Sequence, residues 1–234
     1  MSTPNLPKYA AVDLLAGLSP PELGQVVRQI RERHWPAGQD IVSHRDDSRD
    51  VYFVLDGRVR VTLFSERGKE IAFRDLDAGQ SFGELAAIDG QPRSADVIAL
   101  KDATVGSVTA GEFMELMRRY PPVAEAALKK LATLVRSLSQ RIYDFSEKGP
   151  VRICNELVRL AQAASTDNGR TARVRPRPKD AEVASRVGSH REAVSRLISE
   201  LDRHGILVRG RGELLIRDIA ALKAYAARLH DQQD

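Results

Sequence analysis

Residues 81–95 combine side chains that could hold a single phosphate group. Arg93 supplies a planar cation that can bind a phosphate through two nitrogens, and Ser94 places a hydroxyl donor beside it. Gly83 permits close approach to the backbone, and residues 84–88 have the composition of one helical turn, whose free N–H groups favour an anion. This combination suits a phosphodiester with one negative charge. A triphosphate would call for Mg²⁺ ligands or a Gly-Lys-Ser/Thr loop, and the sequence has neither.

Glu84 is an acidic residue within this predicted anion site, so it requires a partner other than the phosphate. A carboxylate that accepts a hydrogen bond from a ribose 2′-hydroxyl is the simplest assignment, because dinucleotide-binding folds use their acidic residue in the same way. The segment therefore predicts a pocket for a phosphodiester joined to a ribose.

A second group of polar residues lies on a helix that is predicted to begin near residue 190, after a turn at Gly188 and with Ser189 as its N-cap. Arg191, Glu192 and Arg196 fall on the outer side of this helix near its start, where a recognition helix meets base edges. Arginine suits bidentate contact with guanine, and glutamate can accept a hydrogen bond from the cytosine amino group. Four apolar residues at helical spacing point inward: Val194, Leu197, Ile198 and Leu201.

The charge distribution agrees with a DNA-binding C-terminal third. Residues 150–234 contain 16 Lys and Arg against 11 Asp and Glu, a net charge of +5, whereas residues 1–149 contain 20 against 21, a net charge of −1. Lys179, Ser189 and His190 flank the predicted recognition helix and are expected to contact phosphate. Two alternatives stay open: an arginine-rich host proteome would also give this charge, and Arg-Glu-x-x-x-Arg can form a solvated ion-pair face.

The elements that must position these residues follow from the apolar pattern. Short alternating segments from residue 40 to residue 108, separated by turns such as Asp56-Gly57, predict an antiparallel sandwich or barrel. Two short helices around Gly188 and a following hairpin predict a winged helix-turn-helix. The other predicted elements are a helical segment over residues 11–35 that is broken at Pro20 and Pro21, helices over 151–164 and 218–229, a polar loop over 165–175, and the hairpin over 206–216.

Residues 121–148 are predicted to form one long helix that opens with Pro121 and Pro122. Apolar residues spaced by three and four positions form a heptad seam, which predicts a two-fold coiled-coil dimer; they are Leu128, Leu131, Val135, Leu138, Ile142 and Phe145. A helix packed on the core of its own domain is the alternative. Polar residues, among them Lys129 and Lys130, flank the seam.

Gly149-Pro150 is a strong helix stop, and we place a domain boundary there. The predicted fold class is α+β: an antiparallel β-roll over residues 1–120, a dimerisation helix over 121–148, and a winged helix-turn-helix over 149–234.

Here the sequence resembles a known family closely. Phe82-Gly83-Glu84-Leu85 and Arg93-Ser94-Ala95 resemble the phosphate-binding cassette of cyclic-nucleotide-binding domains, most nearly that of the bacterial cyclic-AMP receptor protein family (the CRP/FNR superfamily). Gly68-Lys69-Glu70 is similar to the family's hairpin in the middle of the β-roll. The resemblance extends over nearly the whole chain.

The resemblance implies roles for individual residues. Gly83, Glu84, Leu85 and Ala86 would hold ribose and phosphate, and Arg93, Ser94 and Ala95 would complete the phosphate clamp. The family's dimer helix also offers a hydroxyl pair to the purine, at positions that correspond to Ser137 and Leu138. Ser137 keeps the hydroxyl and Leu138 departs from the pattern. Phe73 and Leu76 are candidate apolar walls for the base.

The function implied is a homodimeric, cyclic-nucleotide-responsive transcription regulator, with cyclic AMP favoured over cyclic GMP. Arg191, Glu192 and Arg196 match the family's base-contacting positions, which implies a palindromic operator with TGTGA-like half-sites. RNA polymerase is an expected partner, and the 165–175 loop is a candidate surface for it. A haem or redox effector on the same architecture, or constitutive DNA binding, is the alternative.

Other chemistries find little support in the sequence. The five histidines are scattered at positions 34, 44, 190, 204 and 230, so no metal site and no enzyme active site is expected. Cys154 is the only cysteine, which excludes an intrachain disulfide and a four-cysteine cluster, and its apolar surroundings predict an inert buried thiol. No signal peptide or membrane span is expected, so the predicted location is the cytoplasm.

Overall fold

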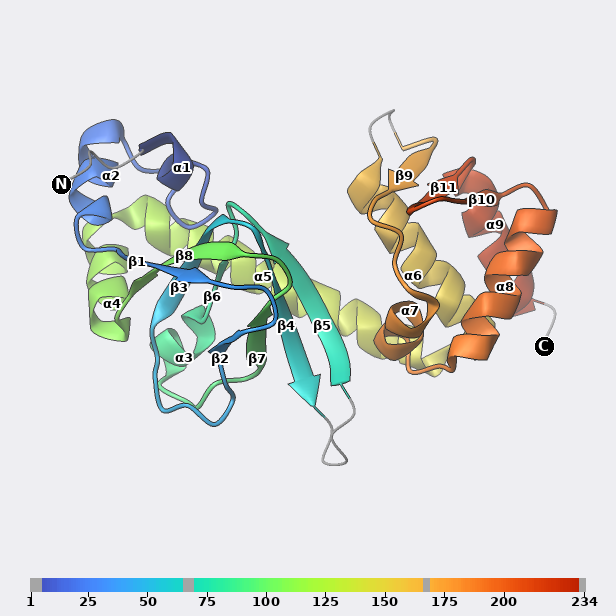
Figure 1. Ribbon diagram of the computed structural model, residues 1–234, viewed down its shortest axis with the longest axis horizontal. Helices are drawn as coiled ribbons and strands as arrows, with labels where there is room; N and C mark the ends of the chain where they lie inside the picture. Colours follow the sequence, from blue (N-terminus) through green and yellow to red (C-terminus); the bar gives the residue numbers. More distant parts are fainter. Residues whose placement is uncertain (1–5, 65–69, 166–168, 232–234) are drawn as a thin grey trace. The chain divides into compact units, whose positions relative to one another are not determined.

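The structure is a computed structural model that describes residues 6–64, 70–165 and 169–231. The chain divides into two compact units, residues 1–135 and 136–234 (Figure 1). The helices are α1 (Leu6–Ala10), α2 (Pro20–Val27), α3 (Glu84–Asp89), α4 (Ala110–Arg119), α5 (Pro121–Ser146), α6 (Gly149–Ala164), α7 (Asp180–Arg186), α8 (Arg191–Arg203) and α9 (Ile219–Asp231).

The strands of the first unit are β1 (Arg31–Trp35), β2 (Asp40–Val42), β3 (Val51–Asp56), β4 (Arg58–Phe64), β5 (Glu70–Asp77), β6 (Ser81–Phe82), β7 (Asp96–Ala99) and β8 (Ala103–Val108). They form two four-stranded antiparallel sheets, in the orders β1-β8-β3-β6 and β2-β7-β4-β5. The predicted antiparallel β-roll is confirmed. Gly57 makes the β3–β4 turn with φ +83°, and a Cβ there would lie 2.2 Å from the Asp102 carbonyl oxygen, so the turn requires glycine.

The N-terminal segment differs from the prediction of a helical segment, broken at Pro20 and Pro21, over residues 11–35. Only α2 is helical in this range, and residues 31–35 form the edge strand β1, which pairs with β8 from Arg31–Ser107 to Trp35–Ala103. Four of the five β1 residues are exposed. Backbone pairing with β8, rather than an alternating apolar face, therefore fixes this strand, and the local pattern could not reveal it.

The apolar residues of α1, α2, α4 and the start of α5 share one core with strand β3. Tyr9, Leu14, Phe113 and Val123 are each at most 2% exposed within it. α5 opens at Pro121, as predicted, and its first turns are therefore anchored on the first unit. The anchored part of this helix is the part that reaches the pocket described below.

The second unit is a winged helix-turn-helix, as predicted. Its strands β9 (Ala172–Val174), β10 (Leu207–Gly210) and β11 (Glu213–Ile216) form a sheet in the order β10-β11-β9, and helices α6 to α9 supply the rest of its core. Part of the predicted 165–175 loop is strand β9, because Ala172 and Val174 are buried against β11. α5 ends at Ser146, and Gly149 begins α6 rather than capping α5.

Candidate nucleotide pocket and DNA-recognition helix

The predicted cassette forms the turn between strand β6 and helix α3. Gly83 is the N-cap of α3 and has φ +89°, in the left-handed region that favours glycine. A Cβ at this position would lie 2.6 Å from the Asp50 carbonyl oxygen and 2.8 Å from Arg93 Nη1. The first N–H groups of α3 have no partner within their own helix, so this turn presents backbone donors.

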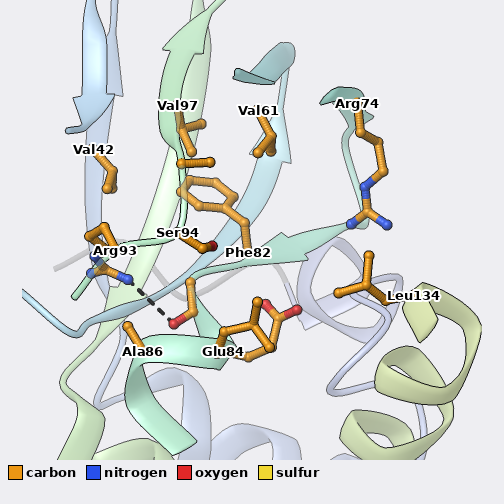
Figure 2. A pocket seen from close by; sticks show the side chains of 13 residues that line it. Val42, Val61, Arg74, Phe82, Glu84, Ala86, Arg93, Ser94, Val97 and Leu134 are labelled. Atoms are coloured by element: carbon orange, nitrogen blue, oxygen red, sulfur yellow. Dashed lines mark hydrogen bonds between the residues drawn. The ribbon is translucent and has the colours of Figure 1, made fainter. Parts of the chain in front are cut away.

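One pocket collects all seven cassette residues that the sequence singled out. Figure 2 shows that Glu84, Ala86, Arg93 and Ser94 surround a common space, with apolar side chains above them. The pocket is lined by Val42, Val61, Arg74, Phe82, Gly83, Glu84, Leu85, Ala86, Arg93, Ser94, Ala95, Val97 and Leu134. Residues 82–86 and 93–97 therefore meet strands β2, β4 and β5 and helix α5 at one place.

Arg93 is buried and held by the protein itself. Its Nη2 donates to the Asp50 carbonyl oxygen (2.9 Å) and to Ser48 Oγ (3.1 Å), and its Nη1 donates to the Gly83 carbonyl oxygen (3.3 Å). The Tyr52 ring lies 5.5 Å from the guanidinium carbon. Burial lowers the pKa of Arg93 from its ordinary value. Arg93 Nε is also buried and has no hydrogen-bond partner in the part of the chain that the structure describes.

Glu84 is also buried, and its partner comes from helix α5. Lys130 Nζ lies 3.2 Å from Glu84 Oε2, and the two side chains are only 11% and 7% exposed. The same ammonium donates to the carbonyl oxygen and the hydroxyl of Ser81, at 2.6 Å each. Lys130, which the sequence placed on the polar flank of the helix, instead reaches into the cassette.

Some residues that line the pocket were not predicted from the sequence. Arg74 brings a second guanidinium to the pocket from β5, and Leu134 closes it from α5 (Figure 2). Val42, Val61 and Val97 are ordinary strand residues whose alternation predicts burial but not a ligand. Only the packing of distant strands brings them together, so no local signal marks them.

The residues predicted to contact the base, and those of the predicted hairpin, have different outcomes. Leu76 is completely buried in the core of the β-roll and does not line the pocket, so its assignment as a pocket wall was wrong. The Phe73 side chain and residues Gly68 and Lys69 of the predicted hairpin lie outside the described residues. Ser137 belongs to the second unit and is exposed, so its contact with a purine stays a prediction.

The second unit places the predicted recognition residues on the outer side of α8. Arg191, Glu192 and Arg196 are exposed, whereas the four apolar residues of the same helix are buried. His190, not Ser189, is the N-cap, and no side-chain hydrogen bond caps this helix. The predicted cap at Ser189 was therefore wrong.

Two arginines hold the recognition helix in place from neighbouring elements. Arg152 on α6 donates from Nε to the Val187 carbonyl oxygen (2.8 Å) and from Nη2 to the Gly188 carbonyl oxygen (3.1 Å), which fixes the turn before α8. Arg209 on β10 donates to the Ser195 carbonyl oxygen (2.7 Å). The turn and the helix are thus fixed to the winged domain while their outer face stays free.

The predicted phosphate contacts lie around the start of α8. Arg191 and Lys179 line one surface hollow, together with Arg177, Pro178, Asp180 and Ala181. Lys179 and His190 are exposed, and Ser189 is half-buried. A basic hollow beside an exposed helix start is suitable for a phosphate of a nucleic acid backbone.

Cys154 fits the prediction of an inert thiol. It is completely buried in the core of the second unit. Burial, together with the charge of Glu200, raises its pKa to about 12, so the reactive thiolate is scarce at neutral pH. No group of three or more His, Cys, Asp or Glu in the described parts of the chain is arranged to hold a metal ion. None of the described helices is long and apolar enough to cross a membrane.

Comparison with known proteins agrees with this geometry. The cyclic nucleotide-binding domain family matches residues 32–120, and the Crp-like helix-turn-helix domain family matches residues 151–225. The chain belongs to the CRP/FNR family of transcription regulators. This CRP/FNR protein is 28% identical over 214 residues to the cyclic AMP receptor protein of Thermus thermophilus, with 91% of this chain and 96% of that protein covered.

Solved structures share the fold of the family at lower identity. A CooA mutant from Carboxydothermus hydrogenoformans has a TM-score of 0.77 at 21% identity, with 97% of each chain covered. CprK, solved in complex with OCPA, has a TM-score of 0.71 at 16% identity, with 87% of this chain and 92% of that chain covered. The fold therefore accompanies more than one effector, and the ligand of this chain must be argued from its own pocket.

Proposed function

We propose that this chain is a cyclic-nucleotide-responsive, sequence-specific DNA-binding regulator that acts as a homodimer. The observation that carries the proposal is the joint position of Glu84, Arg93 and Ser94 on the wall of one pocket. A carboxylate suited to a ribose hydroxyl and a guanidinium suited to a phosphate stand on either side of the same space (Figure 2). Sites of this composition suit a small nucleotide with a single phosphodiester.

The environment of Arg93 supports a singly charged ligand. Two of its nitrogens are engaged by protein oxygens, and the buried Nε lacks a partner among the described residues. An unsatisfied buried donor costs roughly 1–3 kcal/mol, so a ligand oxygen that reaches Arg93 Nε would be favourable. A phosphodiester oxygen supplies such an acceptor together with the charge that complements the guanidinium.

Cyclic AMP is favoured over cyclic GMP as the ligand. Val42, Val61, Val97 and Leu134 form an apolar surface that suits the face of a purine, and it adds no acceptor for the guanine amino group. The 28% identical relative from Thermus thermophilus is a cyclic AMP receptor protein. Leu138 lacks the hydroxyl that the family offers to the base, so this preference depends on the pocket itself.

The DNA-binding part of the proposal depends on α8. Its exposed Arg191, Glu192 and Arg196 have the donors and acceptors to contact guanine and cytosine edges, in the order that implies TGTGA-like half-sites. Ser189, His190 and Lys179 would contact phosphates beside it. RNA polymerase is the expected further partner of such a regulator, which would act in the cytoplasm.

The homodimer is proposed from the seam on α5. Leu128, Val135, Leu138 and Ile142 are 66%, 61%, 37% and 72% exposed in the single chain, an unusual number of large apolar residues on one helix. A second copy would bury them in a coiled coil through residues 121–148. Two recognition helices about 34 Å apart could then enter successive major grooves of a palindromic operator.

Isothermal titration calorimetry with cyclic AMP and cyclic GMP tests the pocket. We expect the wild-type protein to bind cyclic AMP, and Glu84→Gln and Ser94→Ala to bind it about tenfold or more weakly, because each loses a charged or phosphate-facing hydrogen bond. Gln91→Ala is the control, since Gln91 lies on the same exposed loop but does not line the pocket. Absence of binding of either nucleotide to the wild type would refute this function.

An absorbance spectrum of the purified protein tests the haem or redox alternative directly. A visible band that scales with protein concentration would favour that alternative. A colourless protein that binds operator with the same affinity with and without nucleotide would favour constitutive DNA binding.

A further inference from the structure

Lys130 is a residue of helix α5 whose ammonium group contacts Glu84, a residue of the pocket wall. It lies four residues before Leu134, which lines the pocket from the same helix. Its ammonium group has three N–H donors, and three oxygens receive them: the Ser81 carbonyl oxygen (2.6 Å), Ser81 Oγ (2.6 Å) and Glu84 Oε2 (3.2 Å). The hydrogen-bonding capacity of this lysine is therefore fully used.

The contacts of Lys130 are anchored in turn by the N-terminal segment. Ser81 is completely buried, and its hydroxyl donates to Asp13 Oδ1 at 2.6 Å. Asp13 Oδ2 also lies 3.8 Å from Lys130 Nζ. The ammonium is thus held by several oxygens at once, which fixes its position far better than an isolated surface ion pair would.

Glu84 depends on this lysine for its orientation. Lys130 is the one hydrogen-bond or ion-pair partner that Glu84 has among the described residues, and it engages only Oε2. The second carboxylate oxygen, Oε1, has no partner among the described residues, and Glu84 lines the pocket. A buried carboxylate with a single partner keeps its direction only as long as that partner is present.

We propose that Lys130 is a positioning residue that directs the Glu84 carboxylate toward the ribose 2′-hydroxyl of the bound nucleotide. The proposal rests on the function proposed above, because it assigns a role within the same pocket. The lysine does not touch the ligand in this scheme. It removes the rotational freedom of Glu84, so that the hydrogen bond to the hydroxyl forms without a further loss of side-chain entropy.

The test compares cyclic AMP with its 2′-deoxy analogue, which lacks the hydroxyl that Glu84 would bind. The dissociation constants of both ligands are measured by calorimetry on the full chain. The variants are Lys130→Met, which keeps the length of the side chain and removes its charge, and Lys130→Gln, which keeps a donor. Lys129→Met is the matched control, because the Lys129 side chain is 75% exposed and, among the described residues, pairs only with the exposed Glu125.

The wild type and Lys129→Met are expected to bind cyclic AMP about tenfold or more tightly than 2′-deoxy cyclic AMP. Lys130→Met should weaken cyclic AMP binding about tenfold and change the dissociation constant of the 2′-deoxy analogue by less than about threefold. The variant should therefore lose most of the preference for cyclic AMP over the analogue. When Glu84 is already replaced by Gln, Lys130→Met should have little further effect on the ratio of the two dissociation constants.

An equal loss for both ligands would overturn the proposal, since a structural lysine would lower both affinities together. Unchanged discrimination in Lys130→Met would overturn it as well. If Lys130→Met does not fold, as judged by far-ultraviolet circular dichroism, the ratio in Lys130→Gln decides, because a neutral amide holds the carboxylate less firmly. A wild type that binds neither nucleotide would refute the proposed function. A wild type that binds cyclic AMP and its 2′-deoxy analogue equally would overturn only the proposal for Lys130, because Glu84 would then not contact the 2′-hydroxyl.

Discussion

The two predicted sites of this protein differ in how the protein holds their functional side chains. In the pocket, Arg93 and Glu84 are buried and already engaged by protein groups. On α8, Arg191, Glu192 and Arg196 are exposed and project from a helix whose backbone is fixed from behind. The pocket is therefore organised before a ligand arrives, whereas the recognition side chains can still adjust.

This difference has a physical reason in the size of the partner. A nucleotide offers few atoms, so its site must be fixed in advance to limit the entropy lost on binding. DNA offers a large surface and many phosphates, so affinity is shared among many contacts and single side chains serve specificity. Substitutions in the pocket should therefore disturb folding as well as binding, while substitutions on α8 should affect DNA binding alone.

The largest effect is expected for Gly83→Ala. The left-handed φ of +89° and the 2.6 Å approach of the new Cβ to the Asp50 carbonyl oxygen should together destabilise the first unit by about 3 kcal/mol. Urea unfolding followed by the fluorescence of Trp35, the one tryptophan of the chain, measures this. Gly90→Ala is the control. Its φ is +70°, but a Cβ at Gly90 would have no atom within 4 Å apart from its chain neighbours, so a destabilisation of about 1 kcal/mol is expected. An equal loss of unfolding free energy in Gly83→Ala and Gly90→Ala would show that the close approach to the Asp50 carbonyl oxygen is unimportant.

Arg191→Ala should have the next largest effect, confined to DNA. We expect binding to the best operator to weaken by about 1–3 kcal/mol and base choice at one position to relax, with the unfolding midpoint followed by far-ultraviolet circular dichroism unchanged. Fluorescence anisotropy with operator variants provides the measurement. Arg203→Ala, at the other end of α8 and also exposed, should leave affinity and base choice nearly as they are. A uniform loss over all DNA sequences would show that Arg191 contacts only phosphate.

Arg74→Leu should have the smallest effect. Arg74 lines the pocket but is partly exposed, so removal of its charge should weaken the binding of an anionic nucleotide by about 1 kcal/mol, or about fivefold. Calorimetry measures this loss. Arg58→Leu is the control, because Arg58 pairs with Asp77 (Nε–Oδ1, 2.5 Å) and lies outside the pocket lining. Tighter binding in Arg74→Leu would mean that this arginine faces away from the phosphate.

Local patterns in the sequence predicted most of this fold because most of its elements have a clear period. A helix is predicted by the heptads of α5 and by the apolar face of α8, and strands are predicted by the alternation of β3 and β4. β1 was missed because its residues, Arg31 to Trp35, show neither period and pair with a strand about seventy positions later. β9 was missed because three residues with one polar between two apolar ones resemble a loop as much as a strand.

The site could be predicted only where its residues are close in sequence. Gly83, Glu84, Arg93 and Ser94 belong to one segment, so their combination was visible. Lys130 is separated from Glu84 by 46 positions and has the composition of a solvated flank. Its contact follows from the packing of α5 on the cassette, which no local pattern encodes, and the same holds for the valines of the pocket wall.

The measurement that tests the account most directly is the coupling between the two sites. Operator affinity is measured by anisotropy without nucleotide and at saturating cyclic AMP, and cyclic AMP affinity is measured by calorimetry without and with saturating operator. If the nucleotide controls DNA binding, the nucleotide must change the operator affinity by the same factor by which the operator changes the cyclic AMP affinity, because linkage is reciprocal. We expect this factor to be at least about tenfold. Operator affinity that is the same with and without a bound nucleotide would contradict the account.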